Sequence, residues 1–126
     1  VLEPLSGYLL LGEKLLTEGK KYAEGFNFGP NEDSVLRVLD VVQKIINLYG
    51  KGEVVINKKD NLHEAALLML NIDKAKKVLN WTPAYTSEQA IENTVEWYKH
   101  FYARDIDIFE FTLKQISDYS KNITWG

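Results

Sequence analysis

Hydrophobic residues recur along most of this chain every three or four positions, which is the period of an amphipathic α-helix. The pattern is regular over 35–49, with a cap expected at Asp33 or Ser34 and an end at Gly50. It returns in a short segment between Asn71 and Asn80, and then in two longer ones. The further helices predicted by this spacing are 71–79, 87–102 and 107–119. The buried face expected for the last helix is formed by Phe109, Leu113 and Ile116.

The segment 3–17 is also predicted to be a helix, and it is apolar on most sides. A helix of this kind needs cover on more than one face. Gly7 and Gly12 lie inside it and could each allow the close approach of another backbone. We therefore expect exposed apolar surface on this helix and self-association of the chain, with contacts at Leu5, Tyr8, Leu9 and nearby leucines.

A shorter period of two is found in only a few places. Phe26 and Phe28 alternate with Asn27 within 25–29, and the apolar run 53–56 has the length of a strand. The apolar run 65–70 could be a strand or a helix, and its position before a helix cap favours a short strand. The expected fold class is therefore α/β, mostly helical, with two or three short strands.

The segment 70–86 predicts a sharp corner between two helices. Asn71 is a candidate N-cap, and Asn80 tolerates the left-handed conformation with which helices often end. Trp81 is expected to turn inward, and Pro83 prevents the helix from continuing. Thr86 and Gln89 form a capping-box pattern for the next helix, as do Asp107 and Glu110 for the last one.

Composition narrows the classes of function. The 126 residues suit one domain, 1–126, and the net charge of −3 provides no basic surface for nucleic acid. The absence of cysteine excludes disulfides and thiolate metal sites. The longest apolar run is too short to span a bilayer and no signal peptide is seen, so we expect a cytoplasmic protein without a membrane partner. Because the chain begins with Val1, we also expect it to be part of a longer protein.

The corner segment carries a resemblance to a known family. NIDKAKKVLNWTP is similar to the signature D-x-x-K-A-x-x-x-L-G-W-x-P of extended short-chain dehydrogenase/reductase enzymes that act on nucleotide sugars, with Asn71 and Asn80 replacing its Asp and Gly. Three further segments resemble the same enzymes in the same order. VLEPLSGYLLL and the HEA of 63–65 are most similar to the CDP-glucose 4,6-dehydratase subfamily, and the other two matches are GFNFGPNEDSVLRVLDVV and FEFTLKQISDY.

The resemblance implies a two-part enzyme of the NAD-dependent epimerase/dehydratase family. This chain would be its C-terminal substrate-binding portion, and a Rossmann domain outside it would bind NAD and supply the catalytic residues. The substrate would be CDP-glucose and the product CDP-4-keto-6-deoxyglucose, for dideoxysugar and lipopolysaccharide biosynthesis. The partners implied are therefore a CDP-sugar and the missing Rossmann domain.

The catalytic and cofactor motifs of that family do not occur among these residues. No G-x-x-G-x-x-G is present, and none of the seven tyrosines is followed by lysine four positions later. That Tyr-Lys pair provides the family's general base. We therefore expect no catalytic residue and no bound cofactor in this chain, and no turnover by it alone.

The resemblance places the candidate substrate contacts in the loop before the corner. Asn61 stands where related epimerases have an arginine for the diphosphate, and Glu64 stands where they have an aspartate for a ribose hydroxyl. Glu64 can accept hydrogen bonds from ribose, whereas Asn61 lacks the charged, bidentate contact of arginine. His63 could donate to a phosphate or to the base. The alternative is a solvated loop in which Glu64 only caps the helix.

Other polar and aromatic residues have simpler interpretations. Lys58 and Lys59 could meet a diphosphate, but a solvated charged loop is the alternative, and His100 is expected to be exposed. His63-Glu64 does not form a zinc motif because no second histidine follows, so no metal site is predicted. Core packing is expected for the large aromatic residues, rather than a ligand cage, at Trp81, Trp97, Phe101 and Tyr102.

Two alternatives remain open at the level of sequence. The chain could come from another nucleotide-sugar dehydratase or epimerase with a different base and sugar. It could also be a non-catalytic helical interaction module whose partner surface is the first helix.

Overall fold

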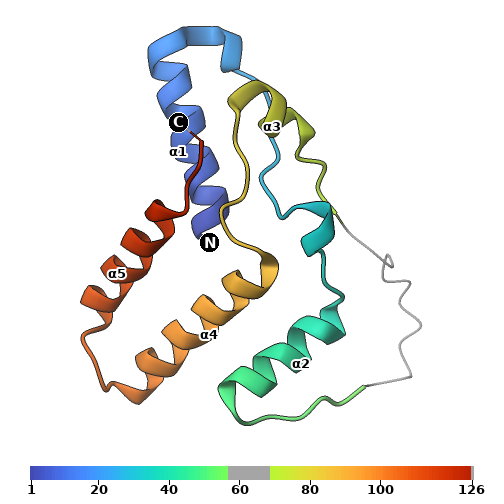
Figure 1. Ribbon diagram of the computed structural model, residues 1–126, viewed down its shortest axis with the longest axis vertical. Coiled ribbons are helices and arrows are strands. Elements are labelled where there is room, and N and C mark those ends of the chain that lie inside the picture. Colours follow the sequence, from blue (N-terminus) through green and yellow to red (C-terminus); the bar gives the residue numbers. More distant parts are fainter. Residues whose placement is uncertain (57–68, 126) are drawn as a thin grey trace.

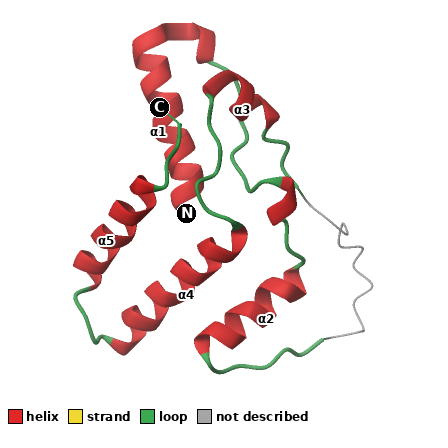
Figure 2. Cartoon of the chain, viewed as in Figure 1, coloured by secondary structure: helices red, strands yellow, loops and turns green. Residues whose placement is uncertain are grey.

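The computed structural model describes residues 1–56 and 69–125. Helices account for all the regular structure within these ranges, as Figure 2 shows. The elements in chain order are α1 (Leu2–Glu18), η1 (Gly19–Tyr22), η2 (Glu32–Ser34), α2 (Val38–Tyr49), α3 (Asp73–Leu79), α4 (Ser87–Ala103) and α5 (Ile108–Lys121).

The predicted strands are not formed in the described residues. Residues 25–29 and 53–56 are irregular, and the third candidate, 65–70, lies mostly outside the described residues. The alternation was interpreted correctly in one respect, because Phe26 and Phe28 both contact the core while Asn27 is exposed. A strand also needs a neighbour that pairs with its backbone N–H and C=O groups. No such neighbour lies beside 25–29 or 53–56 in the described chain, so the α/β class is wrong for this part of the molecule.

The core is small and lies where α1, α3 and the segment around Phe28 meet. Trp81 is fully buried in it, as the sequence predicted. Its ring meets Phe28 edge-on with a centroid distance of 5.0 Å. Gly7 permits this packing, because a Cβ atom there would overlap the Phe28 ring. The core comprises Leu10, Phe28, Ile72, Ala75, Leu79 and Trp81.

The helices α2, α4 and α5 form a second group on the other side of the molecule (Figure 1). The pairs in contact are α2 with α4 and α4 with α5. Val95 is the buried hydrophobic residue of α4, whereas Tyr98, Phe101 and Tyr102 of that helix leave much of their surface exposed. The core packing predicted for Phe101 and Tyr102 is therefore wrong, as is the buried face predicted for Phe109, Leu113 and Ile116. The helical period was right, but the described chain has too few elements to cover these faces.

Most helices begin or end where the local sequence predicts. Gly50 and Asn80 are both left-handed, with φ values of 86° and 56°, and end α2 and α3 as predicted. The Thr86–Gln89 capping box is complete, with both hydrogen bonds present. The Asp107 side chain caps α5 by accepting from two backbone amides.

Two predicted helix starts need correction. The helix predicted from 35 begins at Val38, because 32–34 form a separate 3-10 turn and the chain is extended at Val35 and Arg37. Neither Asp33 nor Ser34 caps it. The side chain of Asn71 accepts from the amide of Asp73 at 2.9 Å, one position further from α3 than an N-cap.

None of the helices in 1–56 and 69–125 is both long enough and apolar enough to cross a bilayer.

Candidate functional site

The predicted substrate contacts Asn61, His63 and Glu64 lie outside the described residues, as do Lys58 and Lys59. The structure does describe the chain that follows them. Asn27 donates a side-chain hydrogen bond to the carbonyl oxygen of Asn71 at 3.2 Å. A Cβ atom at Gly29 would be in ordinary van der Waals contact with Leu70 and Ile72. The segment that leads from the predicted contacts into α3 therefore rests on residues 27–29.

A charged contact also joins the start of α3 to the segment that precedes residues 27–29. The Lys74 ammonium lies 2.5 Å from a carboxylate oxygen of Glu24 and 4.8 Å from the centre of the Phe26 ring. The hydrogen bond from Lys74 lowers the pKa of Glu24. Lys74 is the lysine of the D-x-x-K-A-like motif and lies at the start of α3, so one face of this short helix is fixed against 24–28.

The most tightly connected polar cluster in the described chain joins α1, the corner after α3 and α5. The Ser6 hydroxyl donates to the carbonyl oxygen of Glu3 at 2.7 Å. It accepts from the Trp81 indole nitrogen at 3.1 Å and from the Tyr119 hydroxyl at 2.8 Å. Ser6, Trp81 and Tyr119 are all buried, so this cluster lies in the interior. It fixes the first turn of α1 against the last turn of α5.

The Glu3 carboxylate extends the cluster to the start of α4. One of its oxygens accepts from the amide of Tyr85 at 2.6 Å, and the other accepts from the amide of Ala84 at 3.1 Å. The Tyr119 hydroxyl lies 3.0 Å from the second oxygen. A carboxylate has enough lone pairs to accept both amide bonds, and the single hydroxyl proton of Tyr119 is shared between this oxygen and Ser6. Glu3 therefore anchors the corner that leads into α4, which makes it a structural residue.

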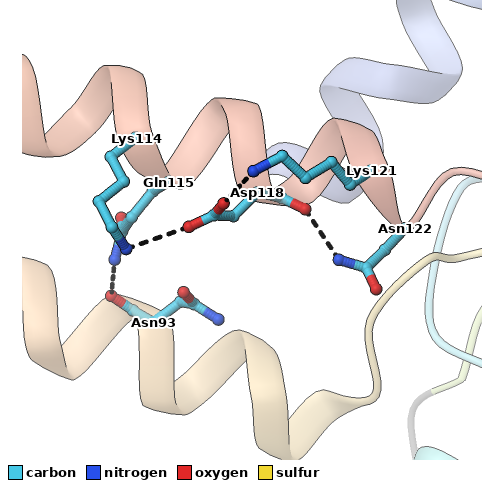
Figure 3. Close-up of polar contacts among 6 residues, drawn as sticks. All are labelled: Asn93, Lys114, Gln115, Asp118, Lys121 and Asn122. Atoms are coloured by element: carbon cyan, nitrogen blue, oxygen red, sulfur yellow. Dashed lines mark hydrogen bonds and ion pairs between the residues drawn. The ribbon is translucent and has the colours of Figure 1, made fainter.

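The helices α4 and α5 are joined by a further set of polar contacts, shown in Figure 3. The side chain of Gln115 donates to the carbonyl oxygen of Asn93 at 2.9 Å across the two helices. Within α5, the carboxylate of Asp118 is flanked by Lys121 at 2.8 Å and Lys114 at 3.1 Å. Hydrogen bonds from these two lysines lower the pKa of Asp118. The two ion pairs of Asp118 are exposed, and ion pairs on the surface contribute little to stability.

His100 makes more contacts with other residues than the sequence predicted. Its Nδ1 lies 2.9 Å from a carboxylate oxygen of Asp105, and its ring packs on Phe111 with a centroid distance of 4.9 Å. The side chain is therefore half-buried at the corner between α4 and α5. The prediction that His100 is only exposed is wrong, because the chain turns after α4 and places Phe111 of α5 against the His100 ring.

An apolar groove of about 410 Å³ lies between the start of α1 and the helices α4 and α5. The Trp97 indole forms part of its wall and donates to the Thr112 hydroxyl at 2.8 Å. Apolar side chains and amides make up most of the lining, which includes Val1, Leu2, Leu5, Ala90, Trp97, Tyr98, Gln115 and Ile116. The groove can take an apolar group, but it offers no cluster of charged groups for a diphosphate.

The buried hydroxyl of Tyr119 is not suited to act as a general base. Burial raises the pKa of Tyr119, which leaves its hydroxyl protonated and unable to act as a base. No group of three His, Asp or Glu side chains in 1–56 and 69–125 is placed to hold a metal ion.

Sequence reasoning missed the cluster around Ser6 and Tyr119. A signal was present, because Glu3 and Ser6 are the polar positions on one side of an otherwise apolar helical segment. A polar group on the buried side of a helix must find hydrogen-bond partners. Tyr119 and Trp81 are 113 and 75 positions away from Ser6, so no local pattern identified them as these partners.

Comparison with known proteins finds two curated enzymes that are similar to this chain. It is 35% identical over 125 residues to a CDP-glucose 4,6-dehydratase of Salmonella typhimurium, which covers 98% of this chain and 34% of that enzyme. It is 32% identical over 73 residues to a UDP-glucuronate 4-epimerase of Thermodesulfobacterium geofontis, which covers 56% of this chain and 21% of that enzyme. The chain thus spans about a third or less of these relatives. No protein-family profile matches the chain.

Proposed function

This chain is a homologue of nucleotide-sugar dehydratases and epimerases, and from that premise we propose that it is the substrate-binding part of a CDP-glucose 4,6-dehydratase. The observation that supports this proposal is the similarity to such an enzyme over 98% of the chain. The reaction proposed for the whole enzyme removes one water from CDP-glucose and gives CDP-4-keto-6-deoxyglucose. The sequence motifs around Lys74 and Trp81 support the same assignment.

The residues of this chain do not fit the NAD that such an enzyme uses. A dinucleotide site needs a glycine-rich turn between a strand and a helix, and the 126 residues contain no such motif. None of the described α-helices follows a strand. We therefore assign NAD binding and the chemical steps to residues outside this chain, and expect the chain alone to be inactive.

We propose Asn61, His63 and Glu64 as the residues of this chain that contact the sugar nucleotide. Glu64 would accept hydrogen bonds from a ribose hydroxyl, and His63 would donate to a phosphate or to the base. Asn61 would donate a neutral hydrogen bond to the diphosphate, which is weaker than the charged contact of an arginine. The contacts of Asn27 and Lys74 with the neighbouring segments support this proposal, because they hold the chain that leads away from these residues.

Calorimetric titration of the 126-residue chain with CDP-glucose tests the proposal. We expect binding that Glu64→Ala weakens about tenfold, which is the loss of one hydrogen bond to a charged group. Lys59→Ala, in the same segment, is the matched control and should change the affinity much less. If the wild-type chain binds no CDP-glucose, these residues are not a binding site in this chain.

The inactivity of the chain is tested separately. Purified chain is incubated with CDP-glucose and NAD, and the sugar nucleotide is followed by mass spectrometry. We expect no loss of water from the substrate. Reproducible formation of the 4-keto product would show that a catalytic group has been overlooked.

A second candidate is supported by the similarity to a UDP-glucuronate 4-epimerase over 73 residues. That assignment predicts tighter binding of a UDP-sugar than of CDP-glucose. Titration with UDP-glucuronate, UDP-glucose and CDP-glucose in parallel distinguishes the two, because the first proposal requires the cytidine ligand to bind best.

A further inference from the structure

The helix α2 is the α-helix that is least integrated into the fold. Every residue of α2 keeps part of its surface exposed, whereas α1, α3, α4 and α5 each contain at least one buried residue. In its first turn, Val38 is 65% exposed and Leu39 is 50% exposed. Elements with few buried apolar contacts open at a lower free energy than the whole molecule. We therefore expect α2 to be the weakest of the five α-helices.

The neighbour of α2 is α4, and the two helices meet incompletely. The helix α4 lies between α2 and α5 and contacts both (Figure 1). A cleft of about 710 Å³ lies between the last residues of α2 and the C-terminal half of α4. Leu48 and Tyr49 line it from α2, and Val95, Glu96 and Lys99 line it from α4. The open cleft limits the apolar surface that docking of α2 can remove from water.

Charged side chains join the two helices along their contact. The ammonium group of Lys44 on α2 lies 3.3 Å from a carboxylate oxygen of Glu88 and 3.4 Å from one of Glu92, both on α4. Lys99 of α4 donates to the carbonyl oxygen of Leu48 at 3.4 Å. The last turn of α2 contains no basic residue of its own, so Lys99 supplies the positive charge that a helix C-terminus favours. More than half of the surface of each glutamate side chain is exposed, so salt can screen these contacts.

The helix α4 is held in place by contacts that do not involve α2. Gln115 of α5 donates to the carbonyl oxygen of Asn93, and the Trp97 indole donates to the Thr112 hydroxyl of α5. The Glu3 carboxylate holds the corner that precedes α4. If α2 leaves α4, these contacts remain.

The chain on both sides of α2 has features of a hinge. It is extended at Val35 and Arg37, just before the helix. Gly50 and Gly52 follow the helix with φ values of 86° and 123°, and glycine accepts large changes in φ and ψ at little cost. Hinges are a few such residues at the ends of an element. From these observations we propose that α2 is a hinged arm, docked on α4 by exposed charges, which opens as a unit when salt screens them while the other helices stay folded.

Amide hydrogen exchange of the 126-residue chain, followed by NMR, tests the proposal. The amides of residues 42–49 report on α2 and those of 91–103 on α4. We expect the α2 amides to exchange at least about tenfold faster than the α4 amides, because the arm opens without global unfolding. Raising the salt concentration from about 0.02 M to 0.5 M should speed exchange in α2 about threefold and leave α4 and α5 unchanged. Equal exchange in α2 and α4, or an equal response of all helices to salt, would show that α2 opens only with the whole molecule.

The variant Lys44→Met tests the charge, because methionine keeps most of the apolar stem of lysine. We expect exchange in α2 to rise about threefold at low salt and to respond less to added salt. Lys114→Met is the matched control, since it removes a similar exposed ion pair, with Asp118 on α5, and should leave α2 unchanged. If Lys44→Met does not alter exchange in α2, or speeds it equally in all helices, the charges do not dock the arm.

A charge reversal provides the rescue. Lys44→Glu places a third negative charge beside Glu88 and Glu92, so exchange in α2 should rise about tenfold. Adding Glu92→Lys restores an opposite pair and should return the protection of α2 to within about twofold of the wild type. A double variant that exchanges as fast as Lys44→Glu alone would overturn the proposal, because the loss would then come from packing rather than from charge.

Discussion

The hydroxyl oxygens of Ser6 and Tyr119 lie 2.8 Å apart in the protein interior, although 113 positions separate the two residues in sequence. Ser6 also accepts the indole N–H of Trp81, which is fully buried. This one serine therefore connects the first helix, the last helix and the corner at Trp81. This buried serine contributes more to the relative placement of the three elements than the ion pairs of the described residues, which are all at least partly exposed.

Ser6→Ala should destabilise the fold by about 1–3 kcal/mol, because it leaves the buried indole N–H of Trp81 without a partner. Tyr119→Phe should cost less, about 1 kcal/mol, since Ser6 and Glu3 keep their other hydrogen bonds. Urea unfolding measures both. Ser120→Ala, an exposed serine on the same helix as Tyr119, is the control and should have little effect. A greater loss for Tyr119→Phe than for Ser6→Ala would contradict this order.

The sequence predicted local features best and distant partners worst. Gly50, Asn80 and the Thr86–Gln89 capping box were predicted correctly, because each depends on residues within one helical turn. The burial of Trp81 was also predicted, from its place after a helix end. Ser6 and Tyr119 were missed, because their pairing depends on how the two ends of the chain meet.

The wrong predictions have a common physical cause. The alternation of Phe26 and Phe28 and the apolar face at Phe109 and Leu113 are real patterns, but each needs a neighbouring element. A strand needs a paired strand, and an apolar helix face needs another surface. The described chain does not supply them. The candidate substrate residues Asn61, His63 and Glu64 lie outside the described residues and remain predictions.

Gly7 and Gly12 lie five positions apart on α1, and the same substitution should have opposite effects at them. A Cβ atom at Gly7 would overlap the Phe28 ring, so Gly7→Ala should cost about 1–3 kcal/mol through overpacking. A Cβ atom at Gly12 meets open space, so Gly12→Ala should gain up to about 1 kcal/mol from helix propensity. Unfolding is measured at a protein concentration low enough to keep the chain monomeric. Equal effects at the two positions would show that Phe28 is not packed as described.

The acid stability of the end of α1 should depend on Glu18. Hydrogen bonds from Lys14 and Lys21 lower the pKa of Glu18 to about 2, from 4.5 for an ordinary glutamate. Since the folded-state pKa is the lower one, the stabilising contribution is present above about pH 4.5 and is lost as the pH falls toward 2. The difference in melting temperature between wild type and Glu18→Gln should therefore shrink over that window.

Salt provides the control for that titration. Because Glu18, Lys14 and Lys21 are at the surface, added salt should reduce the difference between wild type and Glu18→Gln at neutral pH. NMR titration of the Glu18 carboxyl group measures the pKa itself. A value at or above 4.5 would show that the two lysines do not hold the carboxylate in solution.

At position 80, glycine should preserve the stability of the fold better than alanine, because the backbone of Asn80 is left-handed with a φ of 56°. Its amide and that of Trp81 both donate to the carbonyl oxygen of Ala75, so the conformation is fixed by the end of α3. Glycine takes up this conformation without steric cost, whereas a Cβ atom makes it unfavourable by about 1–2 kcal/mol. We expect Asn80→Gly to be neutral or stabilising in urea unfolding, and Asn80→Ala to destabilise. Arg104 ends α4 with a φ of 53°, so Arg104→Gly and Arg104→Ala form a matched pair away from the core. If glycine and alanine are equivalent at both positions, the helices do not end in the left-handed conformation in solution.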